Sequence, residues 1–187
     1  MTAPVVVGIT GATGIVYGVE LLRCLKEMGQ PAHLIVSEWG ARTLSLETDF
    51  TIDEVRGLAA EVYGNKDLAA AVSSGSFATR GMVIAPCSIK TLSGIANSYT
   101  ETLMIRAADV TLKERRPLIL AVREAPLHKG HLELMTRAAD LGAIILPPVP
   151  AFYTRPKTVE DIVRHTVGRI LDHLGIEHAL SERWTGP

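Results

Sequence analysis

The sequence is poor in cysteine and in net charge, and it contains no long apolar run. Its two cysteines, Cys24 and Cys87, give no basis for a disulfide framework and fit a reducing cytosol. With 19 basic and 20 acidic side chains the net charge is −1, whereas a protein that binds nucleic acid needs a strong positive field. No apolar run reaches the roughly 18 residues of a membrane span, and residues 1–7 lack the basic region of a signal peptide. We therefore expect a cytoplasmic protein that binds neither nucleic acid nor membrane.

Apolar residues are abundant, at 47% of the 187 positions against 21% for charged residues. This composition is typical of a folded protein with a substantial core and not of a disordered chain. The length corresponds to one domain, at about 150 residues per domain, so we expect a single domain over residues 1–187. High apolar content with so little net charge also favours a homo-oligomer, because association covers apolar surface that one small chain leaves exposed.

Apolar β-branched runs alternate along the chain with segments of helical spacing. Residues 51–54 and 158–161 resemble capping boxes, in which a hydroxyl and a carboxylate satisfy backbone N–H groups at a helix start. The alternation predicts a parallel sheet with right-handed crossovers, which is a three-layer, doubly wound α/β domain of the flavodoxin or Rossmann type. Residues 62–80 are small and polar and are assigned no element. The expected strands are 4–10, 32–37, 81–86, 118–122 and 143–146, and the expected helices are 15–28, 91–96, 103–115, 128–141 and 159–174.

Two turns that follow expected strands have residues suited to binding an anion. In domains of this class, ligands bind beyond the carboxyl ends of the strands. Residues 10–14 (TGATG) join the first strand to a helix, where glycines let the backbone approach a ligand and the helix N-terminus offers free N–H groups. Residues 86–91 (PCSIKT) repeat this arrangement after the third strand, and Ser88 is placed either to cap the next helix or to hold a phosphate. Two such turns at one sheet edge indicate a phosphorylated ligand.

Charged and aromatic residues follow the last two expected strands. Arg123 and Glu124 come directly after the fourth strand, where an arginine suits anion recognition and a carboxylate suits proton transfer. The loop 147–153 (PPVPAFY) is stiff and apolar and ends in Tyr153. This loop is suited to cover a flat ring, although a packed surface loop explains it as well. Arg169, taken alone, is typical of a solvated charge on a helix.

The remaining reactive side chains indicate no separate site. Cys87 has no histidine near it in sequence, so we expect a small buried residue rather than a nucleophile. Lys113 belongs to a KERR segment that is typical of a solvated helix end. The six histidines show no metal-ligand spacing, except that His128 and His131 are three apart. We therefore expect surface histidines and no bound metal.

The first turn also matches the nucleotide-binding loop of extended short-chain dehydrogenases. Tyr153 and Lys157 imitate the Tyr-x-x-x-Lys pair of those enzymes. That pair requires a helix to align its side chains, whereas Pro156 lies inside it and three further prolines precede it. Glu38, after the second strand, at best mimics the acid that binds a ribose. A dehydrogenase is therefore disfavoured.

Taken together, these segments resemble the UbiX/Pad family of flavin prenyltransferases over nearly the whole chain. The matching residues are 10–14, 47–49, 85–92, 106–118, 123–127, 147–153, 159–163 and 169–171. As a set they are far more specific than one glycine-rich turn. Members of this family are similar to flavodoxin-like flavoproteins and usually form dodecamers, which agrees with the apolar composition.

The resemblance implies an activity. Reduced FMN is alkylated by the dimethylallyl group of dimethylallyl phosphate, first at flavin N5 and then by ring closure at C6. The product, prenylated FMN, serves a UbiD-type decarboxylase. Such a reaction needs cations that stabilise the departing phosphate and a dry apolar pocket that keeps water from the allyl cation.

The resemblance also implies roles for single residues. Glu47 would lie near flavin N5, Glu124 would relay protons through the leaving phosphate, and Trp184 would close over the prenyl chain. The residues implied to bind FMN are Gly11, Ala12, Thr13, Ser37, Ser88, Ile89, Lys90, Thr91 and Arg123. Those implied to bind the prenyl phosphate are Tyr153 and Arg169, with Lys113 and with Arg106 from a neighbouring subunit.

Thr13 departs from the family, whose loop commonly has serine at this position. Threonine keeps the hydroxyl and adds a methyl group that faces the flavin, and we expect the site to tolerate it. Three other functions stay open: a non-catalytic subunit that carries FMN or prenylated FMN for a hydroxyaromatic acid decarboxylase, a flavodoxin-like cysteine decarboxylase, and a redox flavodoxin. Residues 44–50 lack the histidine that a cysteine decarboxylase needs there, and a redox flavodoxin would not need Arg169 or Glu124.

Overall fold

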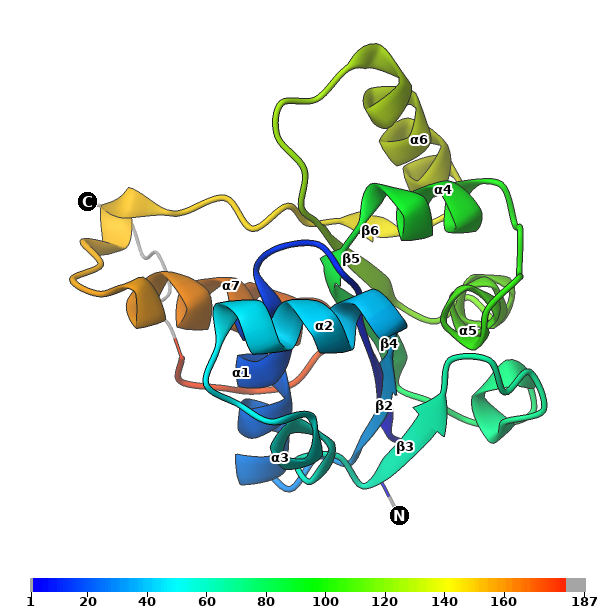
Figure 1. Cartoon of the computed structure of the whole chain (residues 1–187), viewed down its shortest axis with the longest axis horizontal. Helices are drawn as coiled ribbons and strands as arrows, with labels where there is room; N and C mark the ends of the chain where they lie inside the picture. Colours follow the sequence, from blue (N-terminus) through cyan, green and yellow to red (C-terminus); the bar gives the residue numbers. More distant parts are fainter. Residues whose placement is uncertain (1, 181–187) are drawn as a thin grey trace.

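The computed structural model describes residues 2–180 and shows one six-stranded, all-parallel sheet covered by helices (Figure 1). The strands are β1 (Val5–Ile9), β2 (Ala32–Val36), β3 (Glu61–Gly64), β4 (Gly81–Cys87), β5 (Leu118–Val122) and β6 (Ile144–Ile145). They lie in the order β3-β2-β1-β4-β5-β6. This order places β1 beside β4, so the chain winds outward from the centre of the sheet in both directions. The doubly wound fold expected from the sequence is confirmed.

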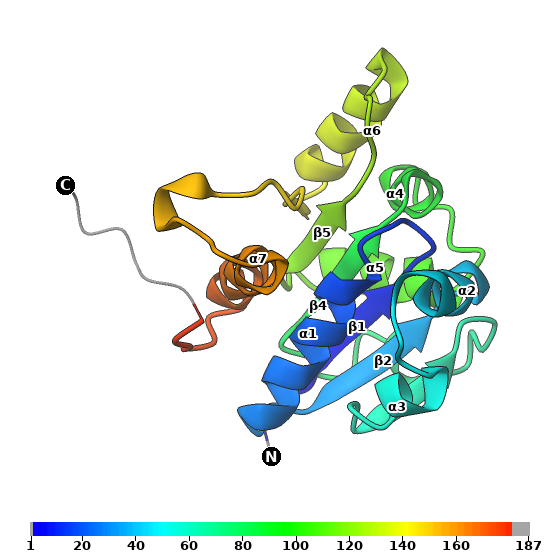
Figure 2. The same ribbon diagram turned by 60° about the vertical axis from the view of Figure 1, so that its left-hand side comes forward.

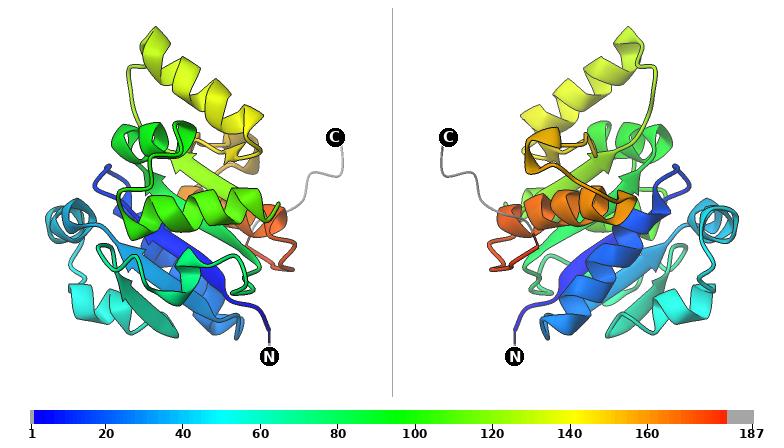
Figure 3. Two further views of the ribbon diagram at one scale, coloured as in Figure 1. Left: turned by 90° about the vertical axis from the view of Figure 1, so that its right-hand side faces the viewer. Right: turned by 90° about the vertical axis from the view of Figure 1, so that its left-hand side faces the viewer.

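Helices pack on both faces of the sheet. They are α1 (Ile15–Glu27), α2 (Glu38–Glu47), α3 (Ile52–Arg56), α4 (Ile89–Ala96), α5 (Leu103–Lys113), α6 (Lys129–Asp140) and α7 (Val159–His173), with 3-10 turns η1 (Ala71–Ser73) and η2 (Phe152–Thr154). The two views of Figure 3 show α4 and α5 in front of one face and α1 and α7 in front of the other. In Figure 2, α7 lies beside α1, and α6 projects outward past α4.

Burial on both faces explains why the strands are continuous apolar runs. All five residues of β1 and all five of β5 are buried. Val5, Val7 and Ile9 belong to the core under α1 and α7, whereas Val6 belongs to the core under α4 and α5. Successive side chains of a strand point to opposite faces, so a strand between two helical layers needs apolar residues at every position. Within residues 2–180, no helix is long and apolar enough to cross a membrane.

Both capping boxes expected from the sequence are present. At α3 the Thr51 hydroxyl accepts the Glu54 N–H, and the Glu54 carboxylate accepts the Thr51 N–H. Thr158 and Asp161 make the same reciprocal pair at α7. Helix α4 begins two residues earlier than expected because Ser88 is its N-cap.

Two elements, β3 and α2, were not expected from the sequence. Strand β3 has four residues at the edge of the sheet, of which the inner two are half-buried and the outer two exposed. It therefore carries neither a long apolar run nor a period of two. In α2 the buried positions are Gly40 and Leu44 among ten described residues, which is too few for an apolar stripe. Short or weakly buried elements give little periodic signal.

The expectation that the histidines lie on the surface is wrong at His33, His131, His165 and His178, which are all partly buried. The side chain of His178 is 2% exposed, and its Nε2 lies 3.1 Å from the Asp172 carboxylate. His33 is half-buried and bonds the Tyr63 hydroxyl through Nδ1 at 3.1 Å, and burial lowers its pKa. The rings that contact His33 belong to Tyr63 and Phe77, which are at least 30 residues away, so the neighbouring sequence gives no sign of its burial.

Candidate active site

The carboxyl edge between β1 and β4 is the topological switch point of the sheet. The crossovers from these two strands lead in opposite directions, which opens a crevice between the turns that follow them. Thr10 joins the two turns. It is 1% exposed, its hydroxyl donates to the Pro86 carbonyl at 2.7 Å, and its oxygen accepts the Ser88 N–H at 2.9 Å. Thr10 therefore fixes the spacing of the crevice, a role that the sequence analysis missed.

The turns after β1, β4 and β5 line one hollow of about 360 Å³. A larger hollow of about 870 Å³, beyond β2 and β3, shares Lys90 with it. The two hollows adjoin at Lys90 along the carboxyl edge, and together they are called the trough below. Of the residues implied to bind FMN, the smaller hollow is lined by Gly11, Ala12, Thr13, Ser88, Ile89, Lys90 and Arg123, and the larger one by Ser37 and Lys90.

Ser88 and Thr91 place hydroxyl groups at the N-terminus of α4. The Ser88 oxygen accepts the Thr91 N–H at 3.3 Å, and the two hydroxyl oxygens are 3.2 Å apart. The first N–H groups of a helix lack intrahelical partners and favour an anion. Cys87, directly before them, is buried, and burial raises the pKa of its thiol to about 12. The expected burial of Cys87 is confirmed, and a high thiol pKa disfavours the nucleophilic thiolate.

The N-terminus of α1 already has an anionic partner. Glu47, the last residue of α2, accepts the N–H groups of Gly14 at 2.8 Å and of Ile15 at 3.1 Å. The sequence predicted an anion at this turn, and in the structure that anion is a side-chain carboxylate. Glu47 thus lies at the end of the turn formed by residues 11–14, and its implied place near flavin N5 stays a prediction.

Gly11 is required by the close approach of α2. A Cβ built on Gly11 would lie 2.5 Å from the Cβ of Trp39. Ser37 caps α2 by accepting the Gly40 N–H at 2.9 Å, and the Thr43 hydroxyl donates to the Gly11 carbonyl at 3.3 Å. Trp39 is 65% exposed and lines the larger hollow, although the sequence analysis did not select it. Its signal was a large aromatic residue directly after a polar strand end.

Arg123 and Glu124 are exposed at the end of β5. The Arg123 N–H donates to the Cys87 carbonyl at 3.1 Å, which holds this segment against β4. Burial raises the pKa of the Tyr17 hydroxyl, and the nearby Arg123 guanidinium partly opposes this shift. The Glu124 carboxylate accepts the Ala125 N–H at 3.1 Å. A cation and a carboxylate therefore border the smaller hollow side by side.

Arg169 lies near the C-terminal end of α7, beside the loop that follows β6. It lines a hollow of about 210 Å³ with Leu146 and Pro147, which directly follow β6. Its guanidinium pairs with Asp172 at 2.6 Å. Tyr153 lies in η2 and is 58% exposed. Arg169, which alone resembles a solvated charge, is thus a cavity residue.

Lys113 does not join this group within one chain. It is the last residue of α5, which ends shortly before β5 begins, and its ammonium pairs with Glu114 at 2.7 Å. A crossover helix runs antiparallel to the strands, so its C-terminus lies at the amino edge of the sheet. The expectation that Lys113 converges with Arg123 and Arg169 at one edge is therefore wrong for a single chain.

Two other implied residues lie apart from the trough. The Arg106 side chain donates to the Ser73 carbonyl at 3.2 Å and pairs with Asp109 at 3.3 Å. Its implied role is in a neighbouring subunit, and that role stays a prediction. Trp184 lies outside the described residues.

The arrangement of Tyr153 and Lys157 disagrees with a dehydrogenase pair. Tyr153 lies in η2, and Lys157 lies between η2 and α7. In this described stretch no common helix aligns the two side chains, as the prolines of the loop predicted.

Known proteins share the fold and much of the sequence. The family model described as Flavoprotein matches residues 2–171. The chain is 56% identical to the flavin prenyltransferase UbiX of Escherichia coli (strain K12) over 97% of each protein. A crystal structure of AnUbiX (PadA1) in complex with FMN and dimethylallyl pyrophosphate has a TM-score of 0.98 and 44% identity, covering 100% of this chain and 99% of that one. A dodecameric FMN-dependent UbiX-like decarboxylase from Escherichia coli O157:H7 has a TM-score of 0.95 and 48% identity, covering 98% and 100%. The chain therefore belongs to the flavoprotein family and, within it, to the UbiX-type flavin prenyltransferases.

Proposed function

We propose that this protein is a flavin prenyltransferase that joins the dimethylallyl group of dimethylallyl phosphate to N5 and C6 of reduced FMN. Inorganic phosphate is the leaving group, and prenylated FMN is the product. The observation that carries the proposal is the trough at the switch point, together with the Arg169 hollow beyond β6, in a chain 56% identical to a UbiX flavin prenyltransferase.

FMN is a substrate of this reaction, and the trough suits both of its ends. Its two hollows lie in the range of volumes that hold small ligands. Residues 11–13 offer backbone and small side chains to the flat ring. Because Glu47 takes up the N–H groups of α1, the phosphate belongs nearer Ser37, Lys90 and the N-terminus of α4, where a cation and free N–H groups favour an anion.

Cations at this edge stabilise the departing phosphate. Cleavage of the allylic C–O bond leaves negative charge on the phosphate, and fixed positive groups lower the barrier to that step. Arg123 after β5 and Arg169 on α7 supply this charge, and the Tyr153 hydroxyl supplies a hydrogen bond. Val149 and Phe152 of the neighbouring loop are 72% and 71% exposed, and they offer apolar surface that keeps water from the allylic group.

Two carboxylates are placed to move or hold protons. Bond formation at C6 releases a proton, and Glu124 borders the hollow beside Arg123, where it accepts that proton through the departing phosphate. Glu47 lies next to residues 11–13, and two backbone N–H groups fix its carboxylate near the ring position.

We also propose that the chain forms a homododecamer and passes prenylated FMN to a UbiD-type decarboxylase. Lys113 and Arg106 reach a trough only if a second chain presents them. Several large apolar side chains are more than 60% exposed, which suits a surface covered by other subunits: Trp39, Leu46, Val149, Phe152 and Val159. Light scattering at working concentration tests the assembly, and a monomer would contradict it.

The activity is tested by mixing the protein with reduced FMN and dimethylallyl phosphate without oxygen and measuring the mass of the flavin product. We expect each protein chain to convert many equivalents of FMN, and each converted flavin to gain one five-carbon unit. A single equivalent per chain would identify a carrier instead. Recovery of unmodified FMN from folded protein would refute the enzymatic proposal.

A further inference from the structure

His165 contacts one proposed phosphate-binding residue and shares a cavity with the other. Residues four apart lie on the same face of a helix, and His165 and Arg169 both line the hollow of about 210 Å³ beyond β6. The rings of His165 and Tyr153 meet edge to face, with centroids 5.9 Å apart and an interplanar angle of 86°. One imidazole therefore links Tyr153 to Arg169.

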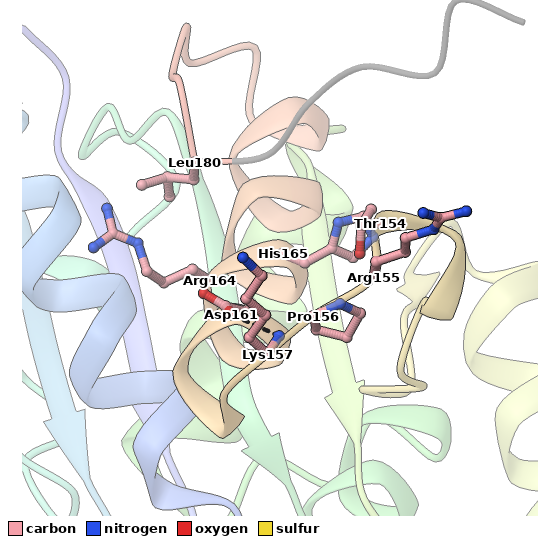
Figure 4. A pocket seen from close by; sticks show the side chains of 8 residues that line it. All are labelled: Thr154, Arg155, Pro156, Lys157, Asp161, Arg164, His165 and Leu180. Atoms are coloured by element: carbon pink, nitrogen blue, oxygen red, sulfur yellow. Dashed lines mark hydrogen bonds between the residues drawn. The ribbon is translucent and has the colours of Figure 1, made fainter.

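His165 also lines a second hollow, of about 370 Å³, beside the loop after η2. In Figure 4 the imidazole lies next to Thr154, and the side chains of Arg155 and Arg164 point away from it. Neither of these two cations faces the His165 ring in this view, whereas Tyr153 contacts the ring and Arg169 shares its hollow.

The Nδ1 atom of His165 is buried and has no hydrogen-bond partner within residues 2–180. Buried polar atoms in native proteins almost always have a partner, so an exception calls for a specific cause. The χ2 torsion of histidine has broad preferences, and no hydrogen bond through Nδ1 is lost when the ring turns. The imidazole can therefore reorient when a partner arrives in the adjoining hollow.

We propose that His165 is a further residue of the prenyl-phosphate site, beside Tyr153 and Arg169. Its edge contact positions the Tyr153 ring, and its imidazole turns to donate an N–H to the phosphate that Arg169 binds. This role rests on the proposed function. Suppose that a hydrogen-bond donor stabilises the bound substrate and the transition state by the same amount. Its loss then raises KM and leaves kcat nearly unchanged.

Two variants separate the ring contact from the hydrogen bond. H165F keeps an aromatic edge for Tyr153 but has no N–H, and H165N keeps a donor near the Nδ1 position. We expect H165F to weaken dimethylallyl phosphate binding about tenfold, equivalent to about 1.4 kcal/mol, with a matching rise in KM and kcat within about twofold. H165N should recover most of the affinity. Calorimetry in the presence of oxidised FMN measures the binding of dimethylallyl phosphate without turnover.

His131 on α6 offers a matched control. Its Nδ1 is likewise buried without a partner among the described residues, and its ring stacks on His128 at 3.6 Å. H131F should leave the affinity and the KM for dimethylallyl phosphate unchanged. That result would show that an unpartnered imidazole nitrogen by itself does not affect binding of this substrate.

The outcomes distinguish this role from the function on which it rests. If H165F and the unmodified protein bind dimethylallyl phosphate with equal affinity, the proposed role of His165 is overturned. Loss of FMN affinity in both H165F and H165N would place His165 in the structural core and would overturn it too. An unmodified protein that binds FMN but neither binds nor transfers the dimethylallyl group would refute the proposed function itself.

Discussion

The Glu47 carboxylate accepts the backbone N–H of Gly14 at 2.8 Å, across 33 residues of sequence. The same oxygen accepts the Ile15 N–H at 3.1 Å, so the last residue of α2 caps the first turn of α1. A carboxylate at this end of a helix also interacts favourably with the helix dipole. The side chain that anchors α1 thus holds the end of the turn whose residues 11–13 line the trough, so we expect ligand binding to depend on this cap.

Replacement of Glu47 by alanine should lower the free energy of unfolding by about 1 kcal/mol, because α1 loses its capping anion. FMN affinity should fall as well, since residues 11–14 lose their tether. Urea unfolding and quenching of FMN fluorescence measure the two effects. Glu27→Ala removes the same charge from the opposite end of α1 and should change neither. Unaltered stability in Glu47→Ala would show that the cap contributes nothing.

Thr10→Val should destabilise the protein by about 2 kcal/mol. Valine has the same shape but no hydroxyl, so the Pro86 carbonyl and the Ser88 N–H lose a buried partner. The crevice between the two turns should also loosen, and FMN affinity should drop. Thr10→Ser keeps the hydroxyl and should cost only the lost methyl group, about 1 kcal/mol. The prediction fails if serine is the more damaging change in chemical denaturation.

The two thiols should make stability depend on alkaline pH. Burial is the largest cause that raises the pKa of both Cys24 and Cys87 to about 12. An unfolded thiol titrates near pH 8.5, so the folded state holds protons that the unfolded state releases. The resulting stability is complete below about pH 8.5 and is lost as the pH rises toward 12.

The measurement is the free energy of unfolding in urea between about pH 8 and pH 10.5. We expect it to fall with rising pH, and the Cys24→Ala/Cys87→Ala variant should show a shallower fall. A thiol reagent at neutral pH should label both cysteines only after denaturation. Rapid labelling of native protein would contradict the burial of these groups.

Arg169→Ala should reduce kcat/KM for dimethylallyl phosphate by about 100-fold, because the departing phosphate loses a fixed cation. FMN affinity should change less than about twofold, since Arg169 does not line the trough. Mass spectrometry of the flavin product and fluorescence titration give the two readouts. Arg164→Ala, which removes the same charge from the same helix, should retain activity. Equal losses in the two variants would mean that general charge, and not position, matters.

Local signals accounted for much of this fold. The apolar runs of β1, β4 and β5 and the two capping boxes depend on neighbouring residues, and all were visible in the sequence. Strand β3 was not, because four edge residues that are only partly buried leave no period to detect. The candidate site divides in the same way: the turns after the strands were predictable, whereas the contacts that join them were not.

The linear order of residues alone determined that strands and helices alternate and that polar turns follow the strands, because these properties come from side-chain shape and backbone propensity over a few positions. Tertiary structure alone decided that β1 lies beside β4, that Thr10 bonds Pro86, that Glu47 caps α1 and that Lys113 lies at the opposite edge. These relationships join segments tens of residues apart, and their geometry depends on how the helices pack across the finished sheet.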